Sequence, residues 1–225
     1  MAPVGTYYGD NRQRQTKVIA AVVAFTGLEV ERAPFEFGVT NKSPEFLTKF
    51  PMGKIPAFED ESGYTLVEGT SIAHYLASIA PQSGLLGSNV KEAAQIDQWI
   101  HFTESEILTY VDRVYGLVLG MTGDYNKGAH DYLINNQNRA LDALEKYLST
   151  HSYLVGDSIT LADIILTATI GRAVAVTLGA AERAIYPNII AYFDRLTAEP
   201  QFKGTFTKYE RIEVAKAFEE KPAST

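Results

Sequence analysis

The stretch FPMGKIPAFEDESGYTLVEGTSIAHYLA, residues Phe50–Ala77, decides the fold. Its pattern predicts a hairpin in which two strands, Ile55–Glu59 and Tyr64–Val67, are joined by the polar turn Asp60–Gly63. A helix is expected directly afterwards, over Ser71–Ala80. Strand, turn, strand and helix therefore follow one another with almost no connecting chain.

The same stretch carries three groups that suit a small zwitterionic ligand. Pro56 stands at the beginning of the first strand, where a proline is expected to be costly, and the backbone beside it is one potential contact. Lys54 supplies a cation two residues earlier. The helix that begins after Glu68 offers free N–H groups and a favourable dipole to an anion.

The residues upstream complete an α/β domain. Asn11 is expected to cap a helix, and Gly27 to end it. With the hairpin, the element order is β-α-β-α-β-β-α, which predicts a four-stranded mixed sheet covered by helices over residues 1–81. The upstream elements are expected at Thr6–Tyr8, Lys17–Phe25, Leu28–Ala33 and Pro44–Leu47.

The residues downstream predict an all-helical domain over 90–225. Residues 81–89 have the composition of a linker, and Pro81 ends the helix before them. The helix that starts at Thr160 is apolar almost all round, which is typical of a helix at the centre of a bundle. Helices are expected over Lys91–Leu119, Asp131–Leu148, Thr160–Leu178, Pro187–Thr197 and Tyr209–Phe218.

The composition narrows the classes of function. A formal net charge of -7 argues against a nucleic-acid partner, and no apolar run is long enough for a secretory signal or a membrane span. We therefore expect a cytoplasmic protein. The absence of cysteine means that any thiol chemistry must use a thiol of the ligand. No metal site is expected, because the histidines match no ligand spacing; they are His74, His101, His130 and His151.

Two motifs resemble those of the glutathione transferase superfamily. One is GKIPAF at Gly53–Phe58, together with EGTSI at Glu68–Ile72. The other is SITLADI at Ser158–Ile164, which predicts a capping box of Thr160 and Asp163 at a buried helix start. The resemblance covers nearly the whole chain and implies a thioredoxin-like N-terminal domain followed by a helical bundle.

Within that superfamily, FEFGVTNKSPEFL at Phe35–Leu47 is most similar to the gamma subunit of translation elongation factor 1B and to fungal transferases of the same subgroup. Long gamma subunits carry a lysine-rich linker and a further domain, neither of which is in this sequence. That difference favours a free-standing glutathione transferase, which adds the glutathione thiolate to a hydrophobic electrophile in detoxification or small-molecule metabolism. The alternative is a non-catalytic interaction module of the elongation factor complex.

The resemblance implies a set of glutathione contacts. Lys54 would bind the glycyl carboxylate, and the backbone of Ile55 would pair with the cysteinyl unit if the bond to Pro56 is cis. Glu68 would accept from the γ-glutamyl ammonium. Many relatives have a serine after this glutamate, where this chain has Gly69, which keeps the backbone N–H and loses the hydroxyl. The remaining implied contacts are Thr70, with Ser71 as a second possible hydroxyl, and Asn41.

The first helix is expected to hold glutathione as a thiolate. Many relatives place Tyr, Ser or Asn there; this chain has Arg12 and Arg14 at the corresponding positions. An arginine can stabilise a thiolate by charge and hydrogen bonding. Arg14 is preferred to Arg12, with Asn11 and Tyr7 as further candidates. Solvated arginines on the first turn are the plain structural alternative.

The resemblance also places an electrophile pocket between the two domains, against the first long helix of the bundle. Phe102, Glu106, Tyr110 and Arg113 share one face of that helix at spacings of three and four. Such a stripe is also typical of a packed core. A homodimer is expected, formed by the first domain of one chain and the long helices of the other.

Overall fold

A computed structural model describes residues 3–206 and 209–217. Its first part is built on a four-stranded mixed sheet in the order β2-β1-β3-β4. Strand β1 lies parallel to β2 and antiparallel to β3, and β3 and β4 form the predicted hairpin. The strands span Thr6–Tyr8 (β1), Glu31–Arg32 (β2), Ala57–Glu59 (β3) and Thr65–Val67 (β4).

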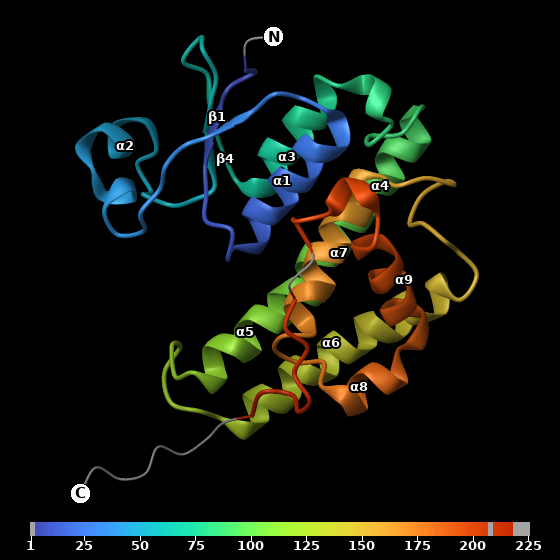
Figure 1. Cartoon of the computed structure of the whole chain (residues 1–225). Helices are drawn as coiled ribbons and strands as arrows, with labels where there is room; N and C mark the ends of the chain where they lie inside the picture. The colour runs from blue at the N-terminus through green and yellow to red at the C-terminus, as the bar shows by residue number, and fades with distance from the viewer. Residues whose placement is uncertain (1–2, 207–208, 218–225) are drawn as a thin grey trace, which may run out of the picture.

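Helices α1 and α3 lie side by side between the sheet and the helical domain, and α2 lies on the opposite side of the sheet (Figure 1). The predicted element order is confirmed. Helix α2 starts with Pro44 directly after its cap Ser43, whose hydroxyl accepts from the Phe46 N–H. The helices span Arg14–Thr26 (α1), Pro44–Lys49 (α2) and Gly69–Ser78 (α3), with a 3₁₀ turn at Thr40–Lys42.

The expectation that Asn11 caps the first helix is wrong. Helix α1 begins at Arg14, and its N-cap residue is Gln13, which makes no side-chain cap bond. The Asn11 side chain instead accepts a hydrogen bond from Arg32 Nη1 at 2.5 Å, so it links the loop before α1 to the edge strand β2. The other end of the helix is as predicted, because Gly27 adopts the left-handed conformation (φ 70°) that ends it.

The second part is helical, with α7 at its centre (Figure 1). The long predicted helix over Lys91–Leu119 is observed as α4 and α5, joined without a break by a π-helical stretch. Helix α8 was not expected from the sequence. The elements span Val90–Phe102 (α4), Thr103–Leu108 (π), Thr109–Val118 (α5), Lys127–Leu148 (α6), Leu161–Ala173 (α7), Ala180–Ile185 (α8) and Pro187–Thr197 (α9), with 3₁₀ turns at Pro81–Ser83 and Pro200–Phe202.

Every residue of α7 except Arg172 is buried, as its apolar pattern predicts. The expected capping box is present at its start. Asp163 Oδ2 accepts from the Thr160 N–H at 2.8 Å and from its hydroxyl at 2.7 Å. Asp163 Oδ1 accepts from the Leu154 N–H at 2.9 Å and from the Tyr192 hydroxyl at 2.6 Å. One buried carboxylate thus joins the preceding loop, the start of α7 and α9.

The helix predicted over Tyr209–Phe218 is wrong where the structure describes it; Phe218 lies outside the described residues. Residues 209–217 are irregular instead, with a bend at Glu213 and Val214. The N–H groups of Ile212 and Lys216 donate to the carbonyls of Val174 and Val176, just after α7. These tertiary hydrogen bonds replace the internal bonds of a helix and lay the segment along the end of α7.

The Asp163 network predicts a strong effect on stability. Asp163→Ala leaves the Leu154 and Thr160 N–H groups and the Tyr192 hydroxyl unpaired in the core. Each such group costs about 1–3 kcal/mol, so the free energy of unfolding in urea should fall by about 3 kcal/mol or more. The matched control is Asp157→Ala, an exposed position in the same loop. Equal unfolding midpoints for the two variants would contradict this role.

Candidate functional site

The N-termini of α1 and α3 meet beside Pro56. The Ile55–Pro56 peptide bond is cis, as predicted. A Cβ placed on Gly69, the first residue of α3, would lie 2.5 Å from Gln15 Cβ and 3.3 Å from Pro56 Cγ. Two helix starts and a strand start are therefore in direct contact. Because the helix dipoles and free N–H groups point the same way, this junction favours an anion.

Glu68 lies at this junction in an unusual backbone conformation. Its φ is 66°, and it is the one residue other than glycine with a positive φ in the described parts of the chain. A glutamate gains nothing locally from the left-handed region, so this strain indicates a position held by its surroundings. The Glu68 and Lys54 side chains are both exposed. Lys54 makes no ion pair with any other described residue. Both charges are accessible to a ligand.

Arg14 lies in the first turn of α1 and is almost entirely buried, with 8% of its side chain exposed. Its Nη2 is 3.4 Å from Glu104 Oε1, and the Thr70 hydroxyl donates to the same oxygen at 2.6 Å. Its Nη1 is buried and has no hydrogen-bond partner among the described residues. Burial lowers the pKa of Arg14, and Glu104 acts against that shift. One N–H₂ group of the guanidinium is therefore buried without a described hydrogen-bond partner beside the helix start.

The other predicted activators differ from Arg14 in their surroundings. The Arg12 side chain is 84% exposed and forms a two-point ion pair with Asp10, whose pKa it lowers to about 2. Asn11 is occupied by its bond from Arg32. Tyr7 is buried in the sheet, and burial raises the pKa of its hydroxyl. Arg14 is thus the buried, incompletely paired cation of the group.

Two further predicted ligand contacts, Asn41 and Thr70, are hydrogen-bonded to other residues of the protein. Asn41 is buried; its Nδ2 donates to the Gly53 carbonyl at 2.8 Å, and its Oδ1 accepts from the Gly38 N–H at 2.6 Å. It therefore holds the turn that precedes Lys54. The Thr70 hydroxyl donates its hydrogen bond to Glu104.

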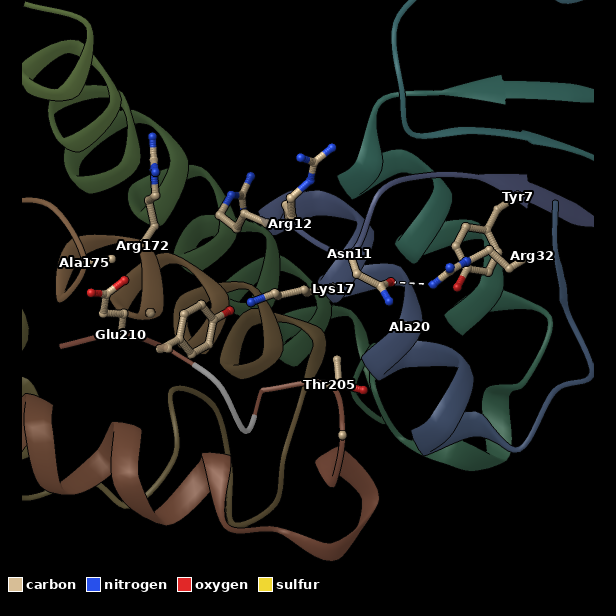
Figure 2. A pocket seen from close by; sticks show the side chains of 14 residues that line it. Tyr7, Asn11, Arg12, Lys17, Ala20, Arg32, Arg172, Ala175, Thr205 and Glu210 are labelled. Atoms are coloured by element: carbon tan, nitrogen blue, oxygen red, sulfur yellow. Dashed lines mark hydrogen bonds between the residues drawn. The ribbon is translucent and has the colours of Figure 1, made fainter. Parts of the chain in front are cut away.

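A cavity of about 860 Å³ opens between the two domains next to this junction (Figure 2). One wall comes from β1, β2 and α1, and the other from the end of α7 and the C-terminal segment. In Figure 2, Lys17 reaches into the space, with Arg172, Ala175 and Glu210 on the opposite side. The predicted activators Tyr7, Asn11, Arg12 and Arg14 all line this cavity.

The cavity is lined by other residues than those predicted for the electrophile pocket. Phe102 packs on Trp99 with a ring-centre distance of 5.3 Å, and Glu106 pairs with Arg139 at 3.3 Å. Tyr110 packs on the separate cluster around Val114 and Leu133, and Arg113 is exposed. None of the four is among the residues lining the cavity in the described structure.

The sequence reasoning missed Glu104 and much of the cavity wall. Glu104 is two residues from Glu106, so on a helix the two face nearly opposite ways. The carboxylate toward the first domain is Glu104, and the π-helical turn that holds it is a feature often found at functional sites. Only the tertiary fold could reveal the other missed wall residues, among them Lys17, Arg32, Arg172, Thr205, Tyr209 and Glu210.

The described residues contain no group of His, Asp or Glu side chains arranged to hold a metal ion. Within the same residues, no helix combines the length and apolar character needed to cross a membrane. The site is thus made of two helix starts, a cis-proline just before strand β3 and an adjoining interdomain cavity, on a thioredoxin-like domain joined to a helical bundle. These features define the glutathione S-transferase fold.

Comparisons with known proteins agree. The family model described as the glutathione S-transferase N-terminal domain matches residues 3–78, and the corresponding C-terminal domain matches residues 105–200. A glutathione S-transferase-like protein from a Fusarium species is 35% identical over 222 residues, covering 97% of this chain and 100% of that protein. The chain belongs to the glutathione S-transferase family.

Other relatives are elongation factors. Elongation factor 1-gamma of Artemia salina is 37% identical over 95% of this chain, which spans about half (48%) of that protein's length. The solved GST-like domain of elongation factor 1-gamma from Saccharomyces cerevisiae superposes with a TM-score of 0.86 at 24% identity, covering 98% of this chain and 100% of that one. At that identity the likeness establishes the fold.

The packing at Gly69 predicts why a serine is absent there. In a Gly69→Ser protein the new Cβ would lie 2.5 Å from Gln15 Cβ in the present geometry. Because both atoms are attached directly to backbone, α3 must move. We expect a loss of about 1–3 kcal/mol in the free energy of unfolding. Gly128→Ser is the control, because a Cβ in that first helical turn meets only Asn126 Oδ1, at 3.3 Å. If Gly69→Ser unfolded at the same temperature as Gly128→Ser, the contact would be unimportant.

Proposed function

We propose that this protein is a glutathione transferase that binds glutathione across the starts of α1 and α3 and holds its sulfur as a thiolate beside Arg14. The observation that carries the proposal is the buried, unpartnered Nη1 of Arg14 at that junction. A buried polar group without a partner costs free energy, so its retention beside two helix starts supports a ligand anion as the missing partner.

The contacts of glutathione follow from the chemistry of its ends. The exposed Glu68 suits the γ-glutamyl ammonium, and the free N–H groups of α3, starting at Gly69, suit the γ-glutamyl carboxylate. The Ile55 backbone beside the cis bond suits the cysteinyl peptide unit, and Lys54 suits the glycyl carboxylate. Asn41 acts by positioning this turn through its bond to the Gly53 carbonyl.

Arg14 serves as a positively charged hydrogen-bond donor to the sulfur. An arginine remains protonated, so it does not remove the thiol proton, which passes to water or to a substrate group. One pKa unit of the thiol corresponds to about 1.4 kcal/mol, and a single buried cation at a helix start can lower a thiol pKa by more than that. In the chemical step the thiolate forms a C–S bond with an electrophilic carbon of the second substrate.

The competing proposal is a non-catalytic interaction module of the translation elongation factor 1B type. It is supported by the similarity to elongation factor 1-gamma and by the hydrogen bond that already occupies the Thr70 hydroxyl. The two proposals differ in ligand: the first requires glutathione to bind, and the second requires a protein subunit, such as the nucleotide-exchange subunit of the complex. Failure to bind glutathione together with capture of that purified subunit would favour the second.

Glu68→Gln tests glutathione binding without changing side-chain size. A hydrogen bond to a charged group contributes about 1.5–3 kcal/mol, so the dissociation constant of glutathione should rise about tenfold to a hundredfold in calorimetry. Glu61→Gln makes the same change of charge on the exposed hairpin turn and should bind like the parent protein. Equal affinity in all three proteins would remove Glu68 from the site.

Arg14→Met tests the activator while keeping a long side chain in the buried space. Loss of the cation should raise the pKa of bound glutathione by about one to two units. Less thiolate is then present at neutral pH, and the deficit disappears as the pH rises above the new pKa. The measurement is a pH titration of thiolate ultraviolet absorbance. Arg12→Met is the comparison variant, because the Arg12 cation is exposed and already paired with Asp10; its bound glutathione should titrate like that of the parent. A raised thiol pKa in Arg12→Met, with none in Arg14→Met, would assign the role to Arg12.

A further inference from the structure

Large aliphatic side chains are missing from the lining of the interdomain cavity that the structure describes. Its aliphatic contribution comes from Ala20 and Ala175 with two glycines, and its two rings are those of Tyr7 and Tyr209. No Leu, Ile, Val, Met or Phe is among the lining residues that the structure describes. This lining differs from the hydrophobic pocket that the sequence predicts.

Charge is the main property of the same wall. Against the single carboxylate of Glu210 stand five cations, which are Arg12, Arg14, Lys17, Arg32 and Arg172. A concave surface with one sign of charge concentrates ligands of the opposite sign.

Three of the five cations have a carboxylate partner outside the cavity wall. Arg12 pairs with Asp10, Arg14 with Glu104, and Arg172 with Asp112 at 3.0 Å. These pairs partly neutralise the wall, so they argue less strongly for a ligand.

Lys17 and Arg32 have no carboxylate within ion-pair distance in residues 3–206 and 209–217. Arg32 donates to the neutral Asn11 amide, as the dashed line in Figure 2 marks. Lys17 is half-buried, with its Nζ 4.1 Å from the ring centre of Tyr209. Burial lowers the pKa of Lys17, and no anion among the described residues offsets that shift. An ammonium held out of water is stabilised when a ligand supplies the negative charge.

Tyr209 adds an uncharged donor at the same place. Its ring packs on α7 at Gly171, where a Cβ would overlap it, and between Phe193 and Phe206. Its hydroxyl oxygen is buried and has no hydrogen-bond partner in the described structure. Burial raises the pKa of this hydroxyl, so it keeps its proton at neutral pH. The hydroxyl is therefore a free donor beside the Lys17 ammonium.

From these donors without acceptors we infer that the second substrate carries a negative charge: the cavity binds the carboxylate of an organic acid, through Lys17 and the Tyr209 hydroxyl. The inference rests on the proposed function and names the class of substrate for it. Arg14 lines both the cavity and the helix junction, so a thiolate at Arg14 adjoins a carboxylate bound at Lys17.

Two glutathione conjugates of nearly equal shape test the charge. S-(2-carboxyethyl)glutathione carries a carboxylate where S-(2-carbamoylethyl)glutathione carries a neutral amide. Calorimetry on the full chain should show the acid bound about tenfold more tightly, as expected for a hydrogen bond between charged groups. The preference should weaken as salt is added.

Variants assign the effect to the cavity. Lys17→Met should abolish the preference for the acid, and Tyr209→Phe, which keeps the ring on Gly171, should reduce it severalfold. Lys203→Met removes the same charge from an exposed residue that does not line the cavity, and should retain the preference. Each variant is first checked for an unchanged unfolding temperature.

The possible outcomes separate the two claims. If glutathione and both conjugates bind, and the conjugates bind equally, the inference is overturned and the glutathione site stands. A preference that Lys203→Met removes as fully as Lys17→Met would also overturn it, since the effect would then be general charge. If neither glutathione nor any conjugate binds, the proposed function fails and the inference fails with it.

Discussion

The structure depends on one buried carboxylate, that of Asp163. A helix that starts inside the core cannot use water for its first N–H groups. Asp163 and Thr160 satisfy them, and Asp163 also binds the Leu154 N–H and the Tyr192 hydroxyl. Burial raises the pKa of Asp163, and these four donors act in the opposite direction. A charge in the core is tolerable only with this number of partners.

The orientation of α7 determines the far wall of the cavity. The residues just after its last turn present the Val174 and Val176 carbonyls, which accept hydrogen bonds from the C-terminal segment. That pairing brings Tyr209 against Gly171 and next to Lys17 of α1. Arg172, the one residue of α7 that is not buried, lies on the same wall. The capping box at the start of α7 and the candidate substrate site at its end are thus parts of one helix.

Local chemistry allowed much of the first domain, and the junction of Pro56 with the helix start after Glu68, to be predicted from sequence. The hairpin, the cis bond before Pro56, the end of α1 at Gly27 and the capping box are each encoded within a few residues. The helix expected over Tyr209–Phe218 failed because its hydrogen bonds are made to residues more than thirty positions away. Asn11 failed as a cap because it bonds across to Arg32. Local helix propensity carries no information about partners that are distant in the sequence.

By itself, the sequence determined the class of fold, the helix start that follows Glu68 and the absence of any protein thiol. Those properties follow from spacing and composition. The tertiary structure alone decided that Arg14 is buried against Glu104 while Arg12 is in solvent, although the two are only two positions apart in the chain. It also decided that the cavity is cationic, because its lysine, arginines and tyrosines come from four distant parts of the chain. Their common location depends on how two domains and a terminal segment pack together, which no local pattern records.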